Sequence, residues 1–285
     1  MILAAGLGTR LRPLTDNRPK ALVEISGRTL LEITLSRLRG YGIREVIINV
    51  HHFADMILDY LKAKKNFGMR VEVSHEEILV DTGGGLKKAA WFFLEDSKCP
   101  HSSQTDEPFL LHNVDVISTI DIPRMVQFHR ESSALATLAV QARESSRLLL
   151  FNEQLQLCGR RAGRDGKPEL VRSNCLSNLQ EGTAEPVPSA VEGAVPKNVE
   201  NSGALAPEVS LQPLAFSGIH VISPRLLPMI TEEGVFSIIA SYLRLAAQGE
   251  KILAFRADEY YWRDLGRPAD LVQAARDLSE RVFCE

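Results

Sequence analysis

Hydrophobic residues recur along the chain in short runs. Five such runs cover residues 1–5, 45–50, 70–74, 109–116 and 134–139. Apolar runs of this length, bounded by polar or turn residues, are typical of strands that are buried on both faces. The pattern therefore predicts at least five buried strands in the first half of the chain.

Between these runs the apolar residues change to a helical spacing. Leu31, Leu35 and Leu38 share one face of a helix expected over residues 29–38, and a second apolar face runs along residues 54–64. Strands that alternate with helices of about ten residues indicate β-α-β units. We therefore predict an α/β domain whose parallel sheet is covered on both faces, with ligands at the carboxyl ends of the strands.

Residues 180–213 depart from this alternation. They contain five prolines, three glycines, five glutamates, one lysine and no aromatic residue. Such a segment buries too little apolar surface to offset its ordering entropy. We therefore predict one domain over residues 1–285 with a flexible insertion at 180–213, a short two-stranded excursion being the alternative. Regular patterning resumes afterwards, with a strand at 214–222, a helix near 236–247, a strand near 251–256 and a helix from 269 to about 282.

Composition limits the partners and the location. Of the 285 residues, 45% are hydrophobic and 24% are charged, and the net charge is -3. This balance is typical of a globular protein and offers no basic field for nucleic acid or an anionic membrane. The cysteines are scattered without a C-x-x-C pair, which argues against a zinc cluster or a disulfide framework: Cys99, Cys158, Cys175 and Cys284. No apolar run approaches the roughly 20 residues of a membrane span, so we expect a cytoplasmic protein.

The loop after the first run is a candidate phosphate site. Gly6 and Gly8 follow the predicted strand directly, and glycines let main-chain amides approach an anion closely. Arg10 and Lys20 add positive charge suited to phosphate oxygens. An ordinary turn beside a solvated cationic face is the alternative, and it is the commoner setting of a bare Gly-x-Gly.

Two better known phosphate motifs are absent from the sequence. A Walker loop needs G-x-x-x-x-G-K-[ST], and residues 83–88 have neither this spacing nor the hydroxyl residue. A dinucleotide fingerprint needs a third glycine where Leu11 stands and an acidic residue where His51 stands. The sequence therefore disfavours a P-loop enzyme and a dinucleotide oxidoreductase.

Two aspartates are candidate metal ligands. Asp115 follows the apolar run that begins at residue 109, and Asp264 stands in a polar break after another predicted strand. Asp115 alone is as typical of a turn residue as of a ligand, and its position after the apolar residues 109–111 favours a ligand. Asp264 alone is weak evidence, because a turn residue is its alternative, and it supports a metal site only together with Asp115 and the opening loop. His51 and His52 lack a third ligand at a recognisable spacing, so we leave them out of the metal site. Trp262 is more typical of packing than of substrate stacking, and Lys87 and Lys88 of a solvated helix face.

Several segments together resemble the sugar-1-phosphate nucleotidyltransferases. The opening motif is LAAGLGTRLRPLT at 3–15 followed by RPKALV at 18–23. It is supported, in the family's order, by DTGGGL at 81–86, NVD at 113–115, FSGI at 216–219 and WRDLGRP at 262–268. The resemblance covers nearly the whole chain outside the insertion. It is strongest to the N-acetylmuramate-1-phosphate uridylyltransferase branch, with the mannose-1-phosphate guanylyltransferases next, and it implies a Rossmann-like, mixed but mostly parallel sheet flanked by helices.

The resemblance also implies a role for individual residues. The catalytic set is Arg10, Lys20, Asp115 and Asp264. Asp115 and Asp264 would bind Mg²⁺, and Lys20 and Gly218 would lie at the sugar phosphate. The nucleotide would contact Leu3, Ala4, Ala5, Gly6, Gly8, Thr9, Thr82, Gly83 and Gly84.

The chain departs from the family pattern at three places. Val114 stands where the family usually has glycine, Leu265 to Pro268 read L-G-R-P rather than V-G-T-P, and an acidic-Lys-Pro segment is missing from the sequence before the insertion. A nucleotidyltransferase-like regulatory or ligand-binding module therefore stays open as the alternative to an active enzyme.

The implied reaction does not require a catalytic base. A sugar 1-phosphate would attack the α-phosphorus of a nucleoside triphosphate in line, releasing an NDP-sugar and pyrophosphate. Because a phosphate monoester has its second pKa at about 6, the nucleophile needs no general base. Positioning and charge stabilisation would then suffice. The base, the sugar and the oligomeric state stay open.

Overall fold

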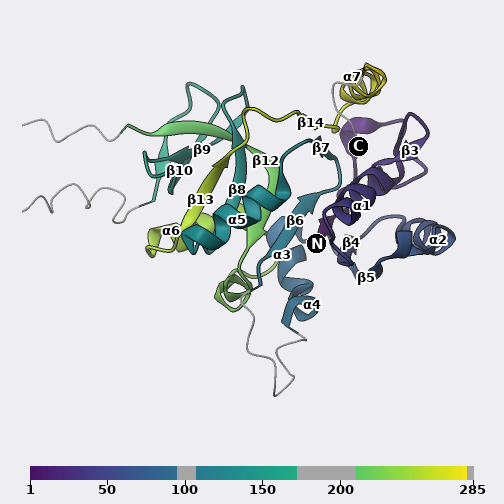
Figure 1. Cartoon of the computed structure of the whole chain (residues 1–285), viewed down its shortest axis with the longest axis horizontal. Helices are drawn as coiled ribbons and strands as arrows, with labels where there is room; N and C mark the ends of the chain where they lie inside the picture. Colours follow the sequence, from purple (N-terminus) through teal and green to yellow (C-terminus); the bar gives the residue numbers. More distant parts are fainter. Residues whose placement is uncertain (95–106, 172–209, 281–285) are drawn as a thin grey trace, which may run out of the picture.

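The computed structural model describes residues 1–94, 107–171 and 210–280 (Figure 1). A ten-stranded mixed sheet forms the centre of this part of the chain, with strand order β11-β10-β9-β12-β6-β1-β4-β5 and with β8 and β13 continuing from β12. The strands of the N-terminal half are β1 (Ile2–Leu3), β4 (Glu45–Val50), β5 (Arg70–His75) and β6 (Phe109–Asn113). The others are β8 (Ala136–Gln141), β9 (Arg147–Phe151), β10 (Leu157–Ala162), β11 (Glu169–Leu170), β12 (Gln212–Ile222) and β13 (Ile252–Arg256).

Seven α-helices surround the sheet within the described residues. They are α1 (Leu30–Gly40), α2 (Ala54–Ala63), α3 (Asp81–Lys88), α4 (Ala90–Leu94), α5 (Ile122–Ser132), α6 (Ile238–Ala247) and α7 (Pro268–Ser279). Two small sheets complete the fold, β2 (Glu24–Ile25) with β3 (Arg28–Thr29), and β7 (Val116–Ser118) with β14 (Trp262–Asp264). None of these helices is long and apolar enough to cross a membrane.

The parallel half of the sheet positions the site. β1 lies between β4 and β6 and pairs in parallel with both, so Leu3 is opposite Asn49 on one side and Asn113 on the other. Later strands are thus added first on one side of β1 and then on the other. Where the strand order reverses in this way, a crevice forms at the carboxyl ends of the strands, and ligands bind there.

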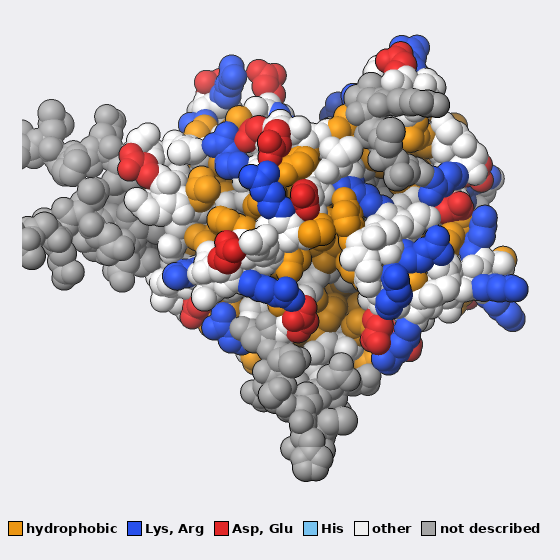
Figure 2. Space-filling model, viewed as in Figure 1, with side chains coloured by type: hydrophobic (Ala, Val, Ile, Leu, Met, Phe, Trp, Pro, Cys, Tyr) orange, Lys and Arg blue, Asp and Glu red, His pale blue; other side chains and the backbone are white. Residues whose placement is uncertain are grey.

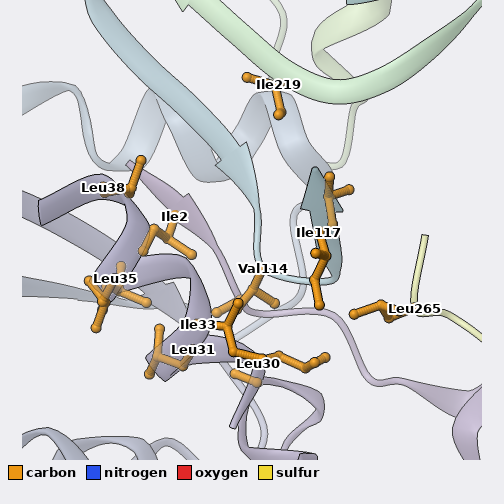
Figure 3. Close-up of a cluster of buried hydrophobic side chains, with 14 of the residues drawn as sticks. Ile2, Leu30, Leu31, Ile33, Leu35, Leu38, Val114, Ile117, Ile219 and Leu265 are labelled. Atoms are coloured by element: carbon orange, nitrogen blue, oxygen red, sulfur yellow. The ribbon is translucent and has the colours of Figure 1, made fainter. Parts of the chain in front are cut away.

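Both faces of the sheet are buried, as predicted. Alternate side chains of β4 enter different hydrophobic clusters: Val46 and Ile48 join a cluster with α1 and α7, while Ile47 joins one with α3 and α6. This alternation follows from the period of two residues along a strand. Figure 3 shows the first cluster, in which Ile2 of β1 lies near Leu35 and Leu38 of α1.

The sheet is mixed because β12 runs against its neighbours. β12 pairs antiparallel with β6, β8 and β9, whereas β13 pairs in parallel with β8. The hydrophobic pattern alone predicted a parallel sheet, and that expectation was incomplete, since an apolar run does not reveal the direction of its strand. The mixed sheet implied by the family resemblance is confirmed.

Several predicted boundaries move in the structure. The run at 109–116 is two strands, because the chain leaves the main sheet after Asn113 and β7 pairs with β14 instead. The end predicted for the insertion, residue 213, is too late in the sequence, because Gln212 and Pro213 already belong to β12 and pair with β9. The remainder of that prediction, residues 180–209, lies outside the described residues, as do Cys99, Cys175 and Cys284.

Candidate functional site

The opening loop turns sharply after β1. Gly8 has φ 65°, in the left-handed region, and its carbonyl accepts a hydrogen bond of 2.9 Å from Thr15 Oγ1. A Cβ at Gly8 would lie 3.0 Å from Thr15 Cγ2 and 3.1 Å from Lys20 Cβ. Glycine is therefore required here both by the backbone conformation and by the close approach of the following loop. Thr9 and Arg10 then form an exposed 3₁₀ turn that ends at the buried Leu11.

A cavity of about 340 Å³ opens beside this loop, at the carboxyl ends of β1 and β6. Its wall includes five of the residues predicted to contact a nucleotide, namely Leu3, Ala4, Ala5, Gly6 and Thr82. The other lining residues are Lys20, Asn49, Glu76, Leu79, Asp81, Asn113, Val114, Asp115 and Val235. Main chain from the end of β1 thus faces acidic, amide and hydroxyl side chains from four other segments.

Asn49 and Glu76 are parts of this wall that the sequence analysis missed. Ala4 N donates to Asn49 Oδ1 at 2.7 Å, and Asn49 Nδ2 donates to Glu76 Oε1 at 2.7 Å. Both side chains are buried, and they connect the ends of β1 and β4 to the residue that follows β5. A partial signal was available, because Asn49 is the penultimate residue of the apolar run 45–50 and Glu76 lies two residues after the run 70–74, and ligands bind at this end of the strands in a parallel sheet.

The glycines of α3 lie behind the cavity rather than along it. Gly83 N donates to Phe236 O at 3.0 Å, and a Cβ at Gly83 would lie 2.3 Å from Phe236 Cε2. A Cβ at Gly84 would lie 2.7 Å from Val80 Cβ. Both glycines are buried and let α3 pack against neighbouring segments, so their expected contact with a nucleotide stays a prediction.

The two predicted metal ligands lie side by side. β14 pairs antiparallel with β7, which puts Asp264 opposite Val116, and Leu265 N donates to the main-chain oxygen of Asp115 at 2.8 Å. Asp264 Oδ1 also accepts a 2.7 Å hydrogen bond from Gly266 N, which fixes one of its oxygens. Two aspartates that are far apart in the sequence therefore share one place in the fold.

Opposing charges act on this pair of carboxylates. Burial raises the pKa of Asp264, and the nearby negative charge of Asp115 raises it further, while Lys20 and Arg10 act in the opposite direction. Lys20 Nζ forms an ion pair with Asp115 Oδ2. Lys20 was expected at the sugar phosphate, and in this structure its ammonium group lies against the carboxylate instead. The site therefore favours added positive charge.

A second cavity of about 990 Å³ lies on the other side of Asn113 and includes Asp264. Its lining includes the predicted residues Arg10 and Gly218. Gly218 has φ 76°, and a Cβ there would lie 2.9 Å from Val116 Cγ2. The full lining is Arg10, Asn113, Val116, Arg143, Glu144, Ser145, Ser146, Arg147, Phe216, Gly218, Trp262, Arg263, Asp264, Arg267 and Asp270.

Arginines give the larger cavity an excess of positive charge. Arg263 is paired with Asp277 at 3.1 Å, whereas the ion pairs of the described residues do not include Arg10, Arg143, Arg147 or Arg267. The charge of Asp264 acts on both Arg10 and Arg143. Arginine guanidinium groups outside ion pairs are suited to bidentate contacts with phosphate. The cavity thus has the electrostatic character of a site for polyanions. Figure 2 shows one face of the molecule, on which Lys and Arg side chains are interspersed with acidic and hydrophobic ones.

Arg143 is held in a defined position inside this cavity. Its guanidinium carbon lies 3.7 Å from the ring centre of Trp262, and Nη2 donates to Phe216 O at 2.7 Å. Trp262 Nε1 in turn donates to Ser217 O at 2.7 Å. Trp262 therefore packs against the guanidinium group of Arg143, which agrees with its interpretation as a packing residue. The sequence analysis missed Arg143, which stands just after β8.

The structure explains three residues that the sequence analysis either left out of the site or noted as a departure from the family pattern. His51 Nδ1 lies 2.7 Å from Glu76 O, which confirms its interpretation as a satisfied residue. Lys87 pairs with Glu233 at 2.6 Å, and neither residue lines either of the two cavities. The side chain of Val114 packs into the hydrophobic cluster shown in Figure 3, where it is 3% exposed, so a valine at this position is accommodated.

Comparison with known proteins identifies the class. Residues 1–148 match the model of the family described as nucleotidyl transferase. The chain therefore belongs to the nucleotidyl transferase family, and the predicted resemblance is confirmed.

Two relatives match most of the chain. It is 29% identical over 283 residues to N-acetylmuramate alpha-1-phosphate uridylyltransferase of Caulobacter vibrioides, which covers 98% of this chain and 96% of that protein. It is 27% identical over 273 residues to mannose-1-phosphate guanyltransferase beta-B of Xenopus laevis, covering 95% of this chain and 62% of that protein. The chain thus spans nearly all of the first relative and less than two thirds of the second.

Solved structures confirm the fold class. A UDP-glucose pyrophosphorylase complexed with UDP-glucose aligns with a TM-score of 0.65 at 16% identity and covers 98% of this chain and 97% of that one. HddC from Yersinia pseudotuberculosis complexed with GMP-PN aligns with a TM-score of 0.63 at 18% identity and covers 97% of both chains. At these identities the likeness concerns the fold alone.

Proposed function

We propose that the chain is a Mg²⁺-dependent sugar-1-phosphate nucleotidyltransferase, which joins a sugar 1-phosphate to a nucleoside triphosphate and releases pyrophosphate. The observation that carries the proposal is the pairing of β7 with β14, because it brings Asp115 and Asp264 together where the two cavities meet. The names of the uridylyltransferase and guanyltransferase relatives support the same reaction class.

In this proposal each cavity takes one substrate. The nucleoside occupies the smaller cavity, against the main chain of Ala4 and Ala5, and its phosphates pass Gly8 and Arg10. The sugar 1-phosphate occupies the larger cavity, near Gly218 and the arginines. Asn113 lines both cavities, so the two substrates would meet beside it.

The reaction exchanges one phosphorus–oxygen bond for another. A phosphate oxygen of the sugar 1-phosphate forms a bond to the α-phosphorus, and the bond from that phosphorus to the α,β-bridging oxygen breaks. The bridging oxygen leaves with the β- and γ-phosphates as pyrophosphate. Since the second pKa of a phosphate monoester is about 6, the attacking group is ionised near neutral pH and no side chain has to remove a proton.

Asp115 and Asp264 fit a magnesium ion. Carboxylate oxygens are hard ligands of the kind that Mg²⁺ prefers, and this ion usually keeps several water or phosphate ligands besides one or two carboxylates. Within the described residues, no group of three or more His, Cys, Asp and Glu side chains could hold a metal, which leaves the remaining positions to water and substrate. When bound, Mg²⁺ supplies positive charge that stabilises the phosphate oxygens.

The remaining charged residues bring the two anions together. Lys20 neutralises Asp115 in this structure and lies in the cavity that the nucleotide would occupy. Arg10 lines the larger cavity together with Asp264. Arg143 presents a guanidinium group held by Trp262 and Phe216, so little side-chain freedom is lost when it binds a phosphate. Positioning of this kind supplies much of the rate in reactions between two bound substrates.

The direct test is pyrophosphate release. The purified chain would be incubated with Mg²⁺, one of several nucleoside triphosphates and one of several sugar 1-phosphates, and pyrophosphate would be followed continuously. We expect release only when all three components are present, and release at least about a hundredfold slower from an Asp115→Asn variant with an unchanged circular dichroism spectrum. A folded chain that binds a triphosphate but releases no pyrophosphate with any pair would instead support a ligand-binding module.

A further inference from the structure

A buried hydrogen-bonded pair stands behind the smaller cavity. Asn49, at the end of β4, is 3% exposed, and Glu76, just after β5, is 1% exposed. Both residues line the cavity. A carboxylate this deeply buried is costly unless donors satisfy its oxygens. Two donors do so here, because Asn49 Nδ2 lies 2.7 Å from Oε1 and Val80 N lies 3.3 Å from Oε2.

The pair fixes the orientation of the Asn49 amide. A main-chain N–H can only donate and an ionised carboxylate can only accept. Since Ala4 N lies 2.7 Å from one end of the amide and Glu76 Oε1 lies 2.7 Å from the other, the oxygen must face Ala4 and the nitrogen must face Glu76. Glu76 thereby determines which end of Asn49 meets the main chain of the opening loop.

Gly85 provides independent support for a built arrangement. A Cβ at this residue would lie 2.8 Å from Asn49 Nδ2 and 2.8 Å from Glu76 Oε1. Contacts this short are not tolerated by real side chains. The third glycine of α3 is therefore the one that leaves room for the pair, whereas Gly83 and Gly84 leave room for Phe236 and Val80.

We propose that Asn49 and Glu76 are positioning residues for the nucleoside triphosphate. They hold Ala4, and with it the main chain of Ala4 to Gly6, where it forms the wall of the cavity. The inference rests on the proposed function for the identity of the ligand. A displacement of about 1 Å in a wall that positions a substrate can lower the reaction rate up to about a hundredfold. Because the nucleoside would rest against this wall, we expect the pair to determine triphosphate affinity without touching the reacting atoms.

An exchange of donor and acceptor tests the pair. Asn49→Asp replaces the donating nitrogen with an oxygen that faces the Glu76 carboxylate, so the two acids repel unless they share a proton. Adding Glu76→Gln restores the contact with reversed polarity: the Gln amide nitrogen donates to the carboxylate introduced on β4, while its oxygen faces Val80 N. In both variants the introduced carboxylate can still accept the hydrogen bond from Ala4 N.

Direct binding of UTP and GTP with Mg²⁺ present is the primary readout. For Asn49→Asp we expect the dissociation constant of the tighter triphosphate to rise about tenfold or more relative to the original chain, because two facing carboxyl groups replace a donor and an acceptor. The double variant should return to within a few fold of the original chain. The charged residues that line the cavity near the pair are Lys20, Asp81 and Asp115, and they are unchanged in all variants.

A matched control separates positioning from simple burial of a new charge. Asn152 is also a buried asparagine whose Oδ1 accepts a main-chain hydrogen bond, from Gln156 N at 2.8 Å, and it lies outside both cavity linings. Asn152→Asp should leave triphosphate affinity unchanged. Steady-state kinetics should also separate the two substrates for Asn49→Asp: the KM for the triphosphate should rise, and the KM for the sugar 1-phosphate should change little.

Several results would overturn the inference. Unchanged triphosphate binding by Asn49→Asp would do so, as would a double variant no better than the single one while circular dichroism shows both to be folded. A chain that releases no pyrophosphate but binds a triphosphate through the pair would refute the proposed function and leave this inference intact. A chain that binds no triphosphate at all would refute both.

Discussion

Gly83→Ala is the substitution whose effect can be worked out most fully from the structure. A Cβ at this residue would lie 2.3 Å and 2.4 Å from two ring carbons of Phe236, and 2.9 Å from its main-chain oxygen. Ordinary contacts between carbon atoms are about 3.5–4.0 Å, so α3 or the ring must move by more than about 1 Å. The movement would also strain the 3.0 Å hydrogen bond from Gly83 N to Phe236 O.

The expected magnitude is a balance of two effects. Overpacking of a buried site costs about 1–3 kcal/mol, while alanine is favoured over glycine inside a helix by about 1 kcal/mol. We therefore expect a net loss of up to about 2 kcal/mol in the free energy of unfolding, measured by urea denaturation. Because Thr82 and Asp81 of α3 line the smaller cavity, triphosphate affinity should fall as well.

Two further variants make this reasoning refutable. Gly40→Ala lies in α1, where an added Cβ meets nothing within 4 Å, and it should be neutral or stabilising by up to about 1 kcal/mol. Phe236→Leu removes the clashing ring atoms and should recover part of the loss in Gly83→Ala, though not all of it, because the main-chain oxygen remains. A Gly83→Ala chain as stable as the Gly40→Ala chain would refute the account of α3.

Three other substitutions test separate parts of the structure. Burial, and to a smaller extent the charge of Asp115, raises the pKa of Asp264, so the ionised form of Asp264 opposes folding above the usual carboxyl range. Asp264→Asn should therefore raise the melting temperature at neutral pH while it lowers kcat at least about a hundredfold. In the original chain, metal affinity should weaken as pH falls through that raised pKa, measured by titration calorimetry. Arg143→Met should raise the KM for the sugar 1-phosphate about tenfold or more without changing that for the triphosphate. Thr29→Ala removes the N-cap of α1, where Thr29 Oγ1 accepts a 3.0 Å hydrogen bond from Glu32 N, and should lower the free energy of unfolding in urea by about 1 kcal/mol.

The sequence predicted the strands and helices with strong apolar patterns. The runs around β4, β5 and β8 and the faces of α1 and α2 all correspond to elements of the structure. These signals are local, because alternation and helical spacing reflect burial of neighbouring residues. β9 and β10 were missed, and the direction of β12 was not given by its hydrophobic pattern, since pairing partners are decided by contacts between distant segments.

The candidate site shows the same division. Gly8, Arg10 and Lys20 stand in one continuous motif, and the motif could be recognised from the sequence. Asn49 and Glu76 belong to no such motif. Their places near the ends of two apolar runs pointed only to this edge of the sheet, and the parallel pairing of β1, β4 and β5 is what brings the two side chains together. Arg143 likewise becomes recognisable as a site residue only through its contact with Trp262, which lies on a strand that is distant in the sequence.

The most direct test of the central claim is a double-mutant cycle on the rate of pyrophosphate release. If Asp115 and Asp264 hold one divalent ion, each substitution to asparagine removes the same site, and residues that act as a unit are strongly non-additive. We therefore predict that each single variant loses at least about a hundredfold in kcat and that the double variant is no slower than the slower single variant. Losses that multiply in the double variant, or full activity in either single variant, would contradict a shared metal site.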